Sequence, residues 1–237
     1  MIRFYAPDIK ESLTLPESDS GHCCRVLRMK NGDEVEIIDG RGNSFHCVIT
    51  DAHPKHTKIR ILSEQIEPKH WIGKITLAVA PTKNIDRMEW LLEKAVEIGV
   101  DRIVLLKCTR SERKDVKIER LDKIIVSAMK QSMKASKPII EGMIKFSDFI
   151  LEKSVAQKFV GYCAPEYPKV RLVDEYTPGR DAIIMVGPEG DFTKEEIDMA
   201  VSNGYKCVTF GNTRFRTETA ALYALSNIHT INELKSN

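Results

Sequence analysis

The sequence predicts an α/β protein, in which a small antiparallel β-barrel precedes a parallel sheet covered by helices. Two observations carry this prediction. From Lys74 onward, apolar runs typical of buried strands alternate with longer segments of helical period, whereas residues 1–68 hold only short β-prone runs and turns. The 237 residues, of which 42% are hydrophobic, can fill two modest cores. We therefore expect a barrel over residues 1–68 and a second domain over residues 74–237.

The barrel is predicted from three β-prone runs. They are DEVEIIDG at 33–40, NSFHCVIT at 43–50 and TKIRILSE at 57–64. Glycines on both sides of Arg41 join the first two runs, and AHPKH at 52–56 joins the last two. Short strands linked by such turns, with no helical period between them, are typical of a small antiparallel barrel.

The second domain is predicted from strands that alternate with helices. The strands are KITLAVA at 74–80, DRIVLLKC at 101–108, KFVGYC at 158–163, AIIMVGPEG at 182–190 and KCVTFG at 206–211. Helices are predicted at 85–98, which ends at Gly99, at 117–136 and at 217–233. A further helix is predicted to begin at the capping-box pair Thr193 and Glu196. This alternation predicts a parallel sheet with both faces covered.

Composition excludes several classes of protein. No apolar stretch approaches the roughly 18 to 20 residues that a membrane helix needs, and the start MIRFYAPDIK lacks the apolar segment of a signal peptide. We therefore expect a cytoplasmic protein without a membrane partner. The six cysteines form no C-x-x-C pair, so neither a disulfide framework nor a metal site is predicted, and the thiols are expected to be reduced and mostly packed.

Positive charge is concentrated in one segment, although the net charge is only +2. Between Arg110 and Lys137 stand nine Lys or Arg residues and four Asp or Glu residues. A solvated helix face and a surface that binds a polyanion both explain such a segment.

Two loops of the second domain form the candidate ligand site. GPEGDF at 187–192 and GNTRFRTETAA at 211–221 each follow a buried strand and lead to a helix N-terminus. Ligands of open parallel sheets bind beyond the carboxyl ends of the strands, where helix N-termini present free N–H groups. The chain has no G-x-x-x-x-G-K-[ST], and its first sheet strand ends in APTK, so neither a P-loop nor an ordinary dinucleotide site is supported.

These two loops resemble the C-terminal signatures of a known enzyme family. MVGPEGDFTKEEI at 185–197 and FGNTRFRTETAALYAL at 210–225 are similar to those of the RsmE family, the 16S ribosomal RNA (uracil-N3)-methyltransferases of the SPOUT superfamily. HCCRVLRMKNGDEVEIIDGRG at 22–42 and PTKNIDRMEWLLEKAVEIGV at 81–100 resemble earlier segments of the same family. The resemblance implies a PUA-like barrel, a C-terminal trefoil knot that binds S-adenosyl-L-methionine, a homodimer, and ribosomal RNA of the small ribosomal subunit as substrate.

The resemblance and the loop chemistry together give candidate site residues. The cofactor is expected at the two loops, where glycines leave room for a ligand; the candidates are Met185, Gly187, Pro188, Glu189, Gly190, Gly211, Arg216, Thr217 and Thr219. Methylation at N3 requires loss of the N3 proton, which a nearby cation promotes by stabilising the anion. Arg216 is the candidate for that role, with Glu218 or Glu189 as proton acceptor, and an acid in a first helical turn is also favourable without any catalytic role.

RNA is expected to contact cations of both domains. Arg25 and Arg28 alternate with apolar residues, which suits a phosphate-binding surface. Phe4 beside Arg3 could stack on a base or belong to the core. The full set of candidates is Arg3, Arg25, Arg28, Lys83, Arg87, Arg110 and Arg113.

Two other functions fit parts of the pattern. They are a non-catalytic RNA-binding assembly factor, which would not need the cofactor, and a SPOUT methyltransferase that acts on another RNA. The chain also departs from the family pattern at several positions. It has Asp191 in place of a usual second glycine, TRFRTETA in place of RILRTETA, and Lys130, Gln131 and Lys134 in place of a Glu-Gln pair and a later Arg.

Overall fold

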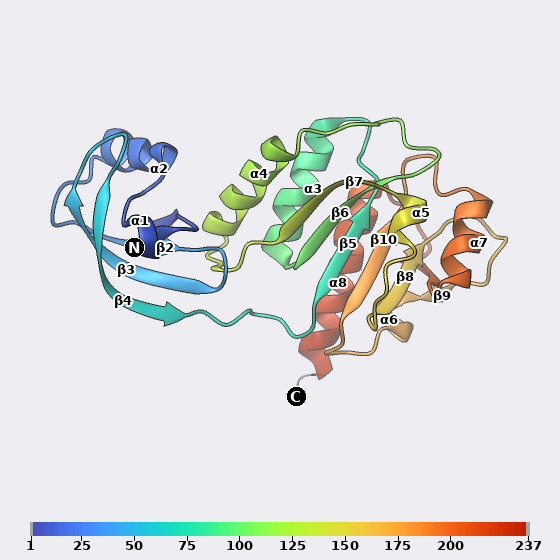
Figure 1. Ribbon diagram of the computed structural model, residues 1–237. Helices are drawn as coiled ribbons and strands as arrows, with labels where there is room; N and C mark the ends of the chain where they lie inside the picture. Colours follow the sequence, from blue (N-terminus) through green and yellow to red (C-terminus); the bar gives the residue numbers. More distant parts are fainter. Residues whose placement is uncertain (1, 236–237) are drawn as a thin grey trace. The chain divides into compact units, whose positions relative to one another are not determined.

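The computed structural model describes residues 2–235 and divides into two compact units (Figure 1). The first unit contains the residues up to Lys69 together with Val126–Lys137, and the second contains His70–Ile125 together with the residues from Pro138 onward. The first unit therefore includes a segment that lies far along the sequence from the predicted domain at 1–68.

The first unit is built on a four-stranded sheet. Its strands lie in the order β1 (Arg3–Tyr5), β2 (Glu34–Ile38), β3 (Asn43–Asp51) and β4 (Lys58–Ile66). The pairs β2/β3 and β3/β4 are antiparallel, but β1 pairs with β2 in parallel. The three predicted strands therefore pair antiparallel as expected, and the sheet is mixed because of β1, which was not predicted since its three residues are too few to show a period.

Three short helical segments before β2 were not predicted. They are α1 (Ile9–Ser12), α2 (Glu17–Gly21) and the π-helical η1 (His22–Val26). The core of the unit contains Phe4, which is 1% exposed and packs with Phe45 and Ile9. The alternative in which Phe4 stacks on a base is therefore wrong.

The second unit is built on a seven-stranded sheet in which every pair is parallel, as predicted. The strands lie in the order β7 (Ile139–Lys145), β6 (Arg102–Lys107), β5 (Ile75–Val79), β10 (Ala182–Val186), β8 (Gln157–Gly161), β11 (Lys206–Thr209) and β9 (Val170–Arg171). The five inner strands match the predicted apolar runs. The edge strands β7 and β9 were not predicted, since neither carries a continuous buried run.

Helices cover both faces of this sheet, as predicted (Figure 1). The helices of this unit are α3 (Ile85–Ile98), α5 (Phe146–Phe149), α6 (Leu172–Glu175), α7 (Lys194–Ser202) and α8 (Thr217–Lys235), together with the first part of α4 (Ile118–Gln131), whose residues from Val126 onward belong to the first unit. The helix predicted at 117–136 is shorter than expected, because the chain turns through a left-handed residue at Met133 (φ 56°). The capping box of Thr193 and Glu196 is present at the start of α7.

The strands of the sheet contribute side chains to two separate layers of core. On β10, Ile183 and Met185 face the cluster that contains Phe146 of α5 and Ile197 of α7. The alternation of a strand directs Val186 to the opposite face. That face carries α3 and α8, which pack on each other.

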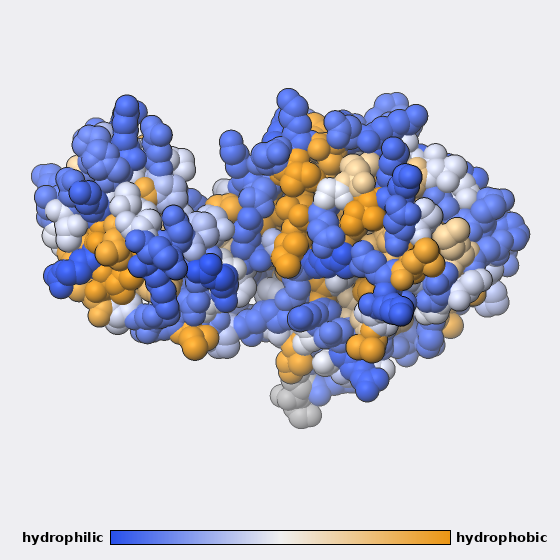
Figure 2. Space-filling model, viewed as in Figure 1, coloured by the Kyte–Doolittle hydropathy of each residue, from blue (hydrophilic) through white to orange (hydrophobic). Residues whose placement is uncertain are grey.

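The described residues hold neither a metal cluster nor a membrane span. Within residues 2–235, no three His, Cys, Asp or Glu side chains are grouped so that they could hold a metal ion, and no helix combines the length and apolar character needed to cross a membrane. All six cysteines are free thiols, and four of them, Cys23, Cys47, Cys108 and Cys207, are buried. In space-filling view, apolar side chains show as separate patches among polar ones (Figure 2).

Candidate active site

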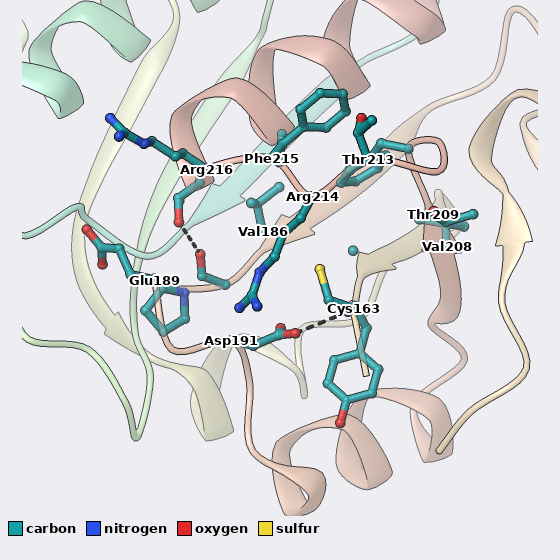
Figure 3. Close-up of a pocket in the computed structure, with 17 residues that line it drawn as sticks. Cys163, Val186, Glu189, Asp191, Val208, Thr209, Thr213, Arg214, Phe215 and Arg216 are labelled. Atoms are coloured by element: carbon teal, nitrogen blue, oxygen red, sulfur yellow. Dashed lines mark hydrogen bonds between the residues drawn. The ribbon is translucent and has the colours of Figure 1, made fainter. Parts of the chain in front are cut away.

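The candidate site lies at the carboxyl edge of the parallel sheet, where the sequence predicted a ligand. A pocket of about 350 Å³ opens beyond the ends of β8, β10 and β11 (Figure 3). Its lining residues fall within the segments 161–163, 186–191 and 208–220. The two predicted loops thus share one pocket, and the end of β8 forms a third wall.

The loop after β10 is tied down by Asp191. The Asp191 N–H closes a turn by donating to the Pro188 carbonyl at 2.9 Å, and Asp191 has a left-handed φ of 61°, which aspartate tolerates. Its Oδ1 accepts the Phe192 N–H at 2.8 Å, and its Oδ2 accepts the Cys163 N–H at 3.1 Å. Because Phe192 is also buried, this loop is anchored both to the core and to the end of β8.

Arg110, from the segment after β6, braces the same loop. Its Nη1 donates to the Gly190 carbonyl at 2.8 Å and to the Phe192 carbonyl at 3.3 Å. A guanidinium that bridges two carbonyls of a loop restrains it at two points. Arg110 therefore has a structural role here, and its predicted contact with RNA stays a prediction.

The segment after β5 holds Glu189 in place. The Lys83 N–H donates to Glu189 Oε1 at 2.9 Å. Arg113 in turn donates from Nε to the Thr82 carbonyl at 3.0 Å and from Nη2 to the Lys83 carbonyl at 2.6 Å. Three of the predicted RNA-binding cations, Lys83, Arg110 and Arg113, thus lie beside the loop after β10.

The loop after β11 is held much less firmly. Gly211 has a φ of 134°, a conformation that L side chains rarely adopt. Within the described chain, the hydrogen bonds of residues 211–215 run only to Thr209. One buried contact joins this loop to its neighbour, because Thr217 Oγ1 donates to the Gly187 carbonyl at 3.0 Å.

The two arginines of this loop point in different directions. In Figure 3 the Arg214 side chain extends into the pocket toward Asp191, whereas the Arg216 side chain extends away from both, on the side of Glu189. Both arginines are exposed and both line the pocket. The sequence named Arg216 as the candidate and missed Arg214.

The predicted cofactor residues divide into two groups. Gly187, Pro188, Glu189, Arg216 and Thr217 line the pocket. Met185, Gly190, Gly211 and Thr219 lie outside its lining. The Met185 side chain belongs to the core cluster on the α5 and α7 face, and Thr219 is exposed on α8.

The other predicted catalytic residue, Glu218, also lies outside the lining. It is 7% exposed, at the start of α8. Its Oε1 lies 3.9 Å from Nε of Arg87, one of the predicted RNA-binding residues. Glu218 is thus paired with a neighbouring cation, and of the two glutamates predicted as proton acceptors only Glu189 lines the pocket.

The sequence missed several lining residues besides Arg214. Among them are Cys163, Asp191 and Tyr162. The exposed Cys163 thiol is a useful probe of its surroundings: burial raises its pKa, nearby Asp191 raises it further, and Arg214 lowers it. Asp191 had one signal in the sequence, since an acid stands there where the family pattern has a glycine.

The predicted RNA-binding residues of the first unit have different surroundings. The Arg3 guanidinium is largely covered and is bound to Glu36 at 2.7 Å, to Glu67 at 2.9 Å and to the Met133 carbonyl at 2.8 Å. Most of its donors are thus occupied by protein groups. Arg25 and Arg28 are exposed instead, and Arg28 has a left-handed φ of 55°.

The parallel sheet with a pocket at its carboxyl edge fits a ligand-binding enzyme, and two family models that match most of the chain show the class of protein, an RNA methyltransferase. Residues 69–229 match the family model described as an RNA methyltransferase domain, and residues 15–62 match the model described as an RNA methyltransferase PUA domain. The chain belongs to the RsmE family of RNA methyltransferases.

Solved structures and curated relatives agree with this assignment over nearly the whole chain. A probable rRNA-methyltransferase from Porphyromonas gingivalis is 42% identical, with a TM-score of 0.94 and coverage of 99% of both chains. Ribosomal RNA small subunit methyltransferase E from Neisseria gonorrhoeae, solved bound to S-adenosyl methionine, is 26% identical, with a TM-score of 0.84 and 98% of both chains covered. The protein of the same name from Rickettsia conorii is 28% identical over 87% of this chain and 84% of its own length.

Proposed function

We propose that this protein uses S-adenosyl-L-methionine to methylate N3 of a uridine in 16S ribosomal RNA of the small ribosomal subunit. The observation that carries the proposal is the pocket formed where Thr217 of one loop bonds to Gly187 of the other. Relatives named ribosomal RNA small subunit methyltransferase E align over most of the chain, and one of them was solved with this cofactor. A bacterial ribosomal substrate would place the protein in the cytoplasm.

The residues of the pocket fit the cofactor. A volume of about 350 Å³ lies within the usual range for a small-molecule site. Val186, Val208, Phe210 and Ala220 supply apolar surface for a flat base, and the loop backbones supply polar groups. A Cβ on Gly161 would lie 2.6 Å from the Phe210 ring, so this wall needs a glycine to keep its shape. When bound, S-adenosylmethionine supplies a methyl group on a sulfonium, whose carbon–sulfur bond breaks as the N3–methyl bond forms.

The chain's own residues then have to generate and hold the uracil anion. Arg216 would supply the positive charge that stabilises this anion, and Glu189 is a better candidate than Glu218 to accept the N3 proton, since Arg216 and Glu189 both line the pocket. The Lys83 N–H fixes one oxygen of Glu189 and leaves its other oxygen available. The carboxylate of Glu218 lies outside the pocket and beside Arg87, so the role of Glu218 is to orient Arg87.

RNA is held by exposed cations. Arg25 and Arg28 of the first unit are exposed and contact phosphate. In the second unit, the residues that contact RNA are Lys83, Arg87, Arg110 and Arg113. Arg3 contributes least, because its guanidinium is already bound to two carboxylates.

The functional unit is a homodimer. The small-residue face of the last helix is not available to a partner, because Ala221, Ala224 and Leu225 are fully buried within this subunit. The better candidates are two aromatic side chains on neighbouring helices, Trp90 of α3 and Tyr223 of α8, which are 47% and 43% exposed. Exposed aromatic residues of this kind are enriched at interfaces.

The test is methyl transfer to small ribosomal subunits from cells that lack this protein. Radiolabelled methyl from S-adenosylmethionine should enter 16S RNA, and mass spectrometry of the digested RNA should find 3-methyluridine. If the protein binds RNA but transfers no methyl group, it is an assembly factor and not an enzyme. If the label enters another RNA, that RNA is the substrate. Light scattering of the protein with Tyr223→Arg, compared with the unaltered chain, tests the dimer.

A further inference from the structure

Two oppositely charged side chains from different loops face each other at one end of the pocket. Asp191 follows β10, Arg214 follows β11, and both line the cavity. In Figure 3 Arg214 extends toward Asp191, with Cys163 beside them. Asp191 and Arg214 both act on the pKa of the Cys163 thiol, so both charges lie near this thiol.

Arg214 has its hydrogen-bonding capacity unused. Among residues 2–235, no hydrogen bond or ion pair holds its guanidinium, and no salt bridge joins it to Asp191. A guanidinium carries five N–H donors in a planar fork that suits a carboxylate. Its direction in the pocket therefore presents a carboxylate-binding group to a ligand.

Asp191 is held rigidly and still has room to accept. Each of its oxygens takes one backbone N–H, from Phe192 and from Cys163. An ionised carboxylate has about four acceptor sites, so about two remain. Asp191 can thus receive an ammonium group without leaving its place in the loop.

The other charged pair of the pocket is less suited to a ligand with both charges. Glu189 is already engaged by the Lys83 N–H, and Arg216 points away from Asp191 and Cys163 (Figure 3). The end at Asp191 and Arg214 is therefore the place for a group that carries a carboxylate and an ammonium on the same carbon.

We propose that Arg214 binds the carboxylate, and Asp191 the ammonium, of the amino-acid end of S-adenosylmethionine. This inference rests on the proposed function and assigns one end of its cofactor.

Three ligands and two variants test the assignment by calorimetry. S-adenosylmethionine carries both charged groups, decarboxylated S-adenosylmethionine keeps only the ammonium, and 5′-methylthioadenosine has neither. Arg214→Gln should bind S-adenosylmethionine about 10- to 100-fold more weakly, as expected for a lost charged hydrogen bond, and should bind the other two ligands normally. Asp191→Asn should weaken the binding of both ammonium-bearing ligands and leave the binding of 5′-methylthioadenosine unchanged.

A structural role for either residue predicts a different pattern. If a variant binds all three ligands equally weakly, the substituted residue shapes the pocket and the proposal fails for that residue. If Arg214→Gln leaves S-adenosylmethionine binding intact and weakens RNA binding, Arg214 is an RNA contact and the proposal fails. Arg171→Ala is the matched control, since Arg171 is exposed, paired with Asp174 and outside the pocket.

The same titrations separate this inference from the proposed function. If the unaltered protein binds none of the three ligands, the proposed function fails and the inference fails with it. If the unaltered protein binds S-adenosylmethionine while both variants bind it equally well, only the inference fails.

Discussion

The two loops that form the pocket differ in how firmly they are held. The loop after β10 is restrained by Arg110, by the N–H groups of Lys83 and Cys163, and by the burial of Phe192. The loop after β11 is exposed from Gly211 to Arg214, and the hydrogen bonds of residues 211–215 run only to Thr209 in the described chain.

This difference assigns different tasks to the two loops. A loop with many anchors keeps its shape whether or not a ligand is present, and a loop with few anchors can rearrange at low cost in free energy when a ligand binds. We therefore expect the loop after β10 to set the shape of the pocket. The loop after β11, which carries Arg214 and Arg216, is expected to close over the ligands.

The largest expected effect comes from the weakly held loop. Arg216→Ala should lower turnover on the order of 10²-fold or more, as expected when a charge that stabilises an anion in the transition state is lost, while S-adenosylmethionine and RNA still bind. Single-turnover methyl transfer at saturating substrate measures it. Near-normal turnover would mean that Arg216 only braces the loop and that the catalytic groups belong to the loop after β10.

The firmly held loop should be sensitive to added volume. A Cβ on Gly187 would lie 3.1 Å from the Phe192 ring and 3.3 Å from the Phe192 nitrogen. Gly187→Val should thus cost about 1–3 kcal/mol in overpacking and weaken cofactor binding about 10- to 100-fold. Gly190→Ala is the control, because its Cβ would meet only Arg110 side-chain atoms, at 3.4 Å. Equal losses in both variants would contradict this distinction.

The bond between the two loops should have an intermediate effect. Thr217→Val removes the hydroxyl that donates to the Gly187 carbonyl and leaves that buried acceptor without a partner. The cost is about 1–3 kcal/mol, seen in the cofactor affinity and in faster hydrogen exchange of residues 211–217. Thr217→Ser keeps the hydroxyl and should behave normally. If Thr217→Val leaves exchange of this loop unchanged, the bond does not couple the loops.

The smallest effect is a change in the reactivity of Cys163, which reports the charges at the pocket end. The thiolate is the reactive form, and nearby Asp191 raises the pKa of Cys163 while Arg214 lowers it. In a Cys24→Ser background at pH 8, Asp191→Asn should lower the pKa and speed alkylation by iodoacetamide roughly two- to fivefold, and Arg214→Gln should slow it. Changes in the opposite direction would mean that the two charges do not act on this thiol.

The sequence by itself determined the inner strands of the second unit and their alternation with helices. Its five inner strands are continuous apolar runs, and such runs identify strands that are buried on both faces. Glycine, proline and capping residues marked the two loops, because these residues are needed wherever the chain turns sharply or a helix begins. The resemblance of these loops to a methyltransferase family followed from the same residues.

Only the tertiary structure decided which side chains face the pocket. Met185 and Val186 are adjacent on β10, yet one enters the core cluster and the other lines the cavity. Arg214 and Arg216 carry the same charge in one loop and point in different directions. Strand β1 could not be predicted from the sequence either, because its three residues form a strand only by pairing with β2. In each case the outcome depends on contacts with residues far along the chain, and the local sequence does not record those contacts.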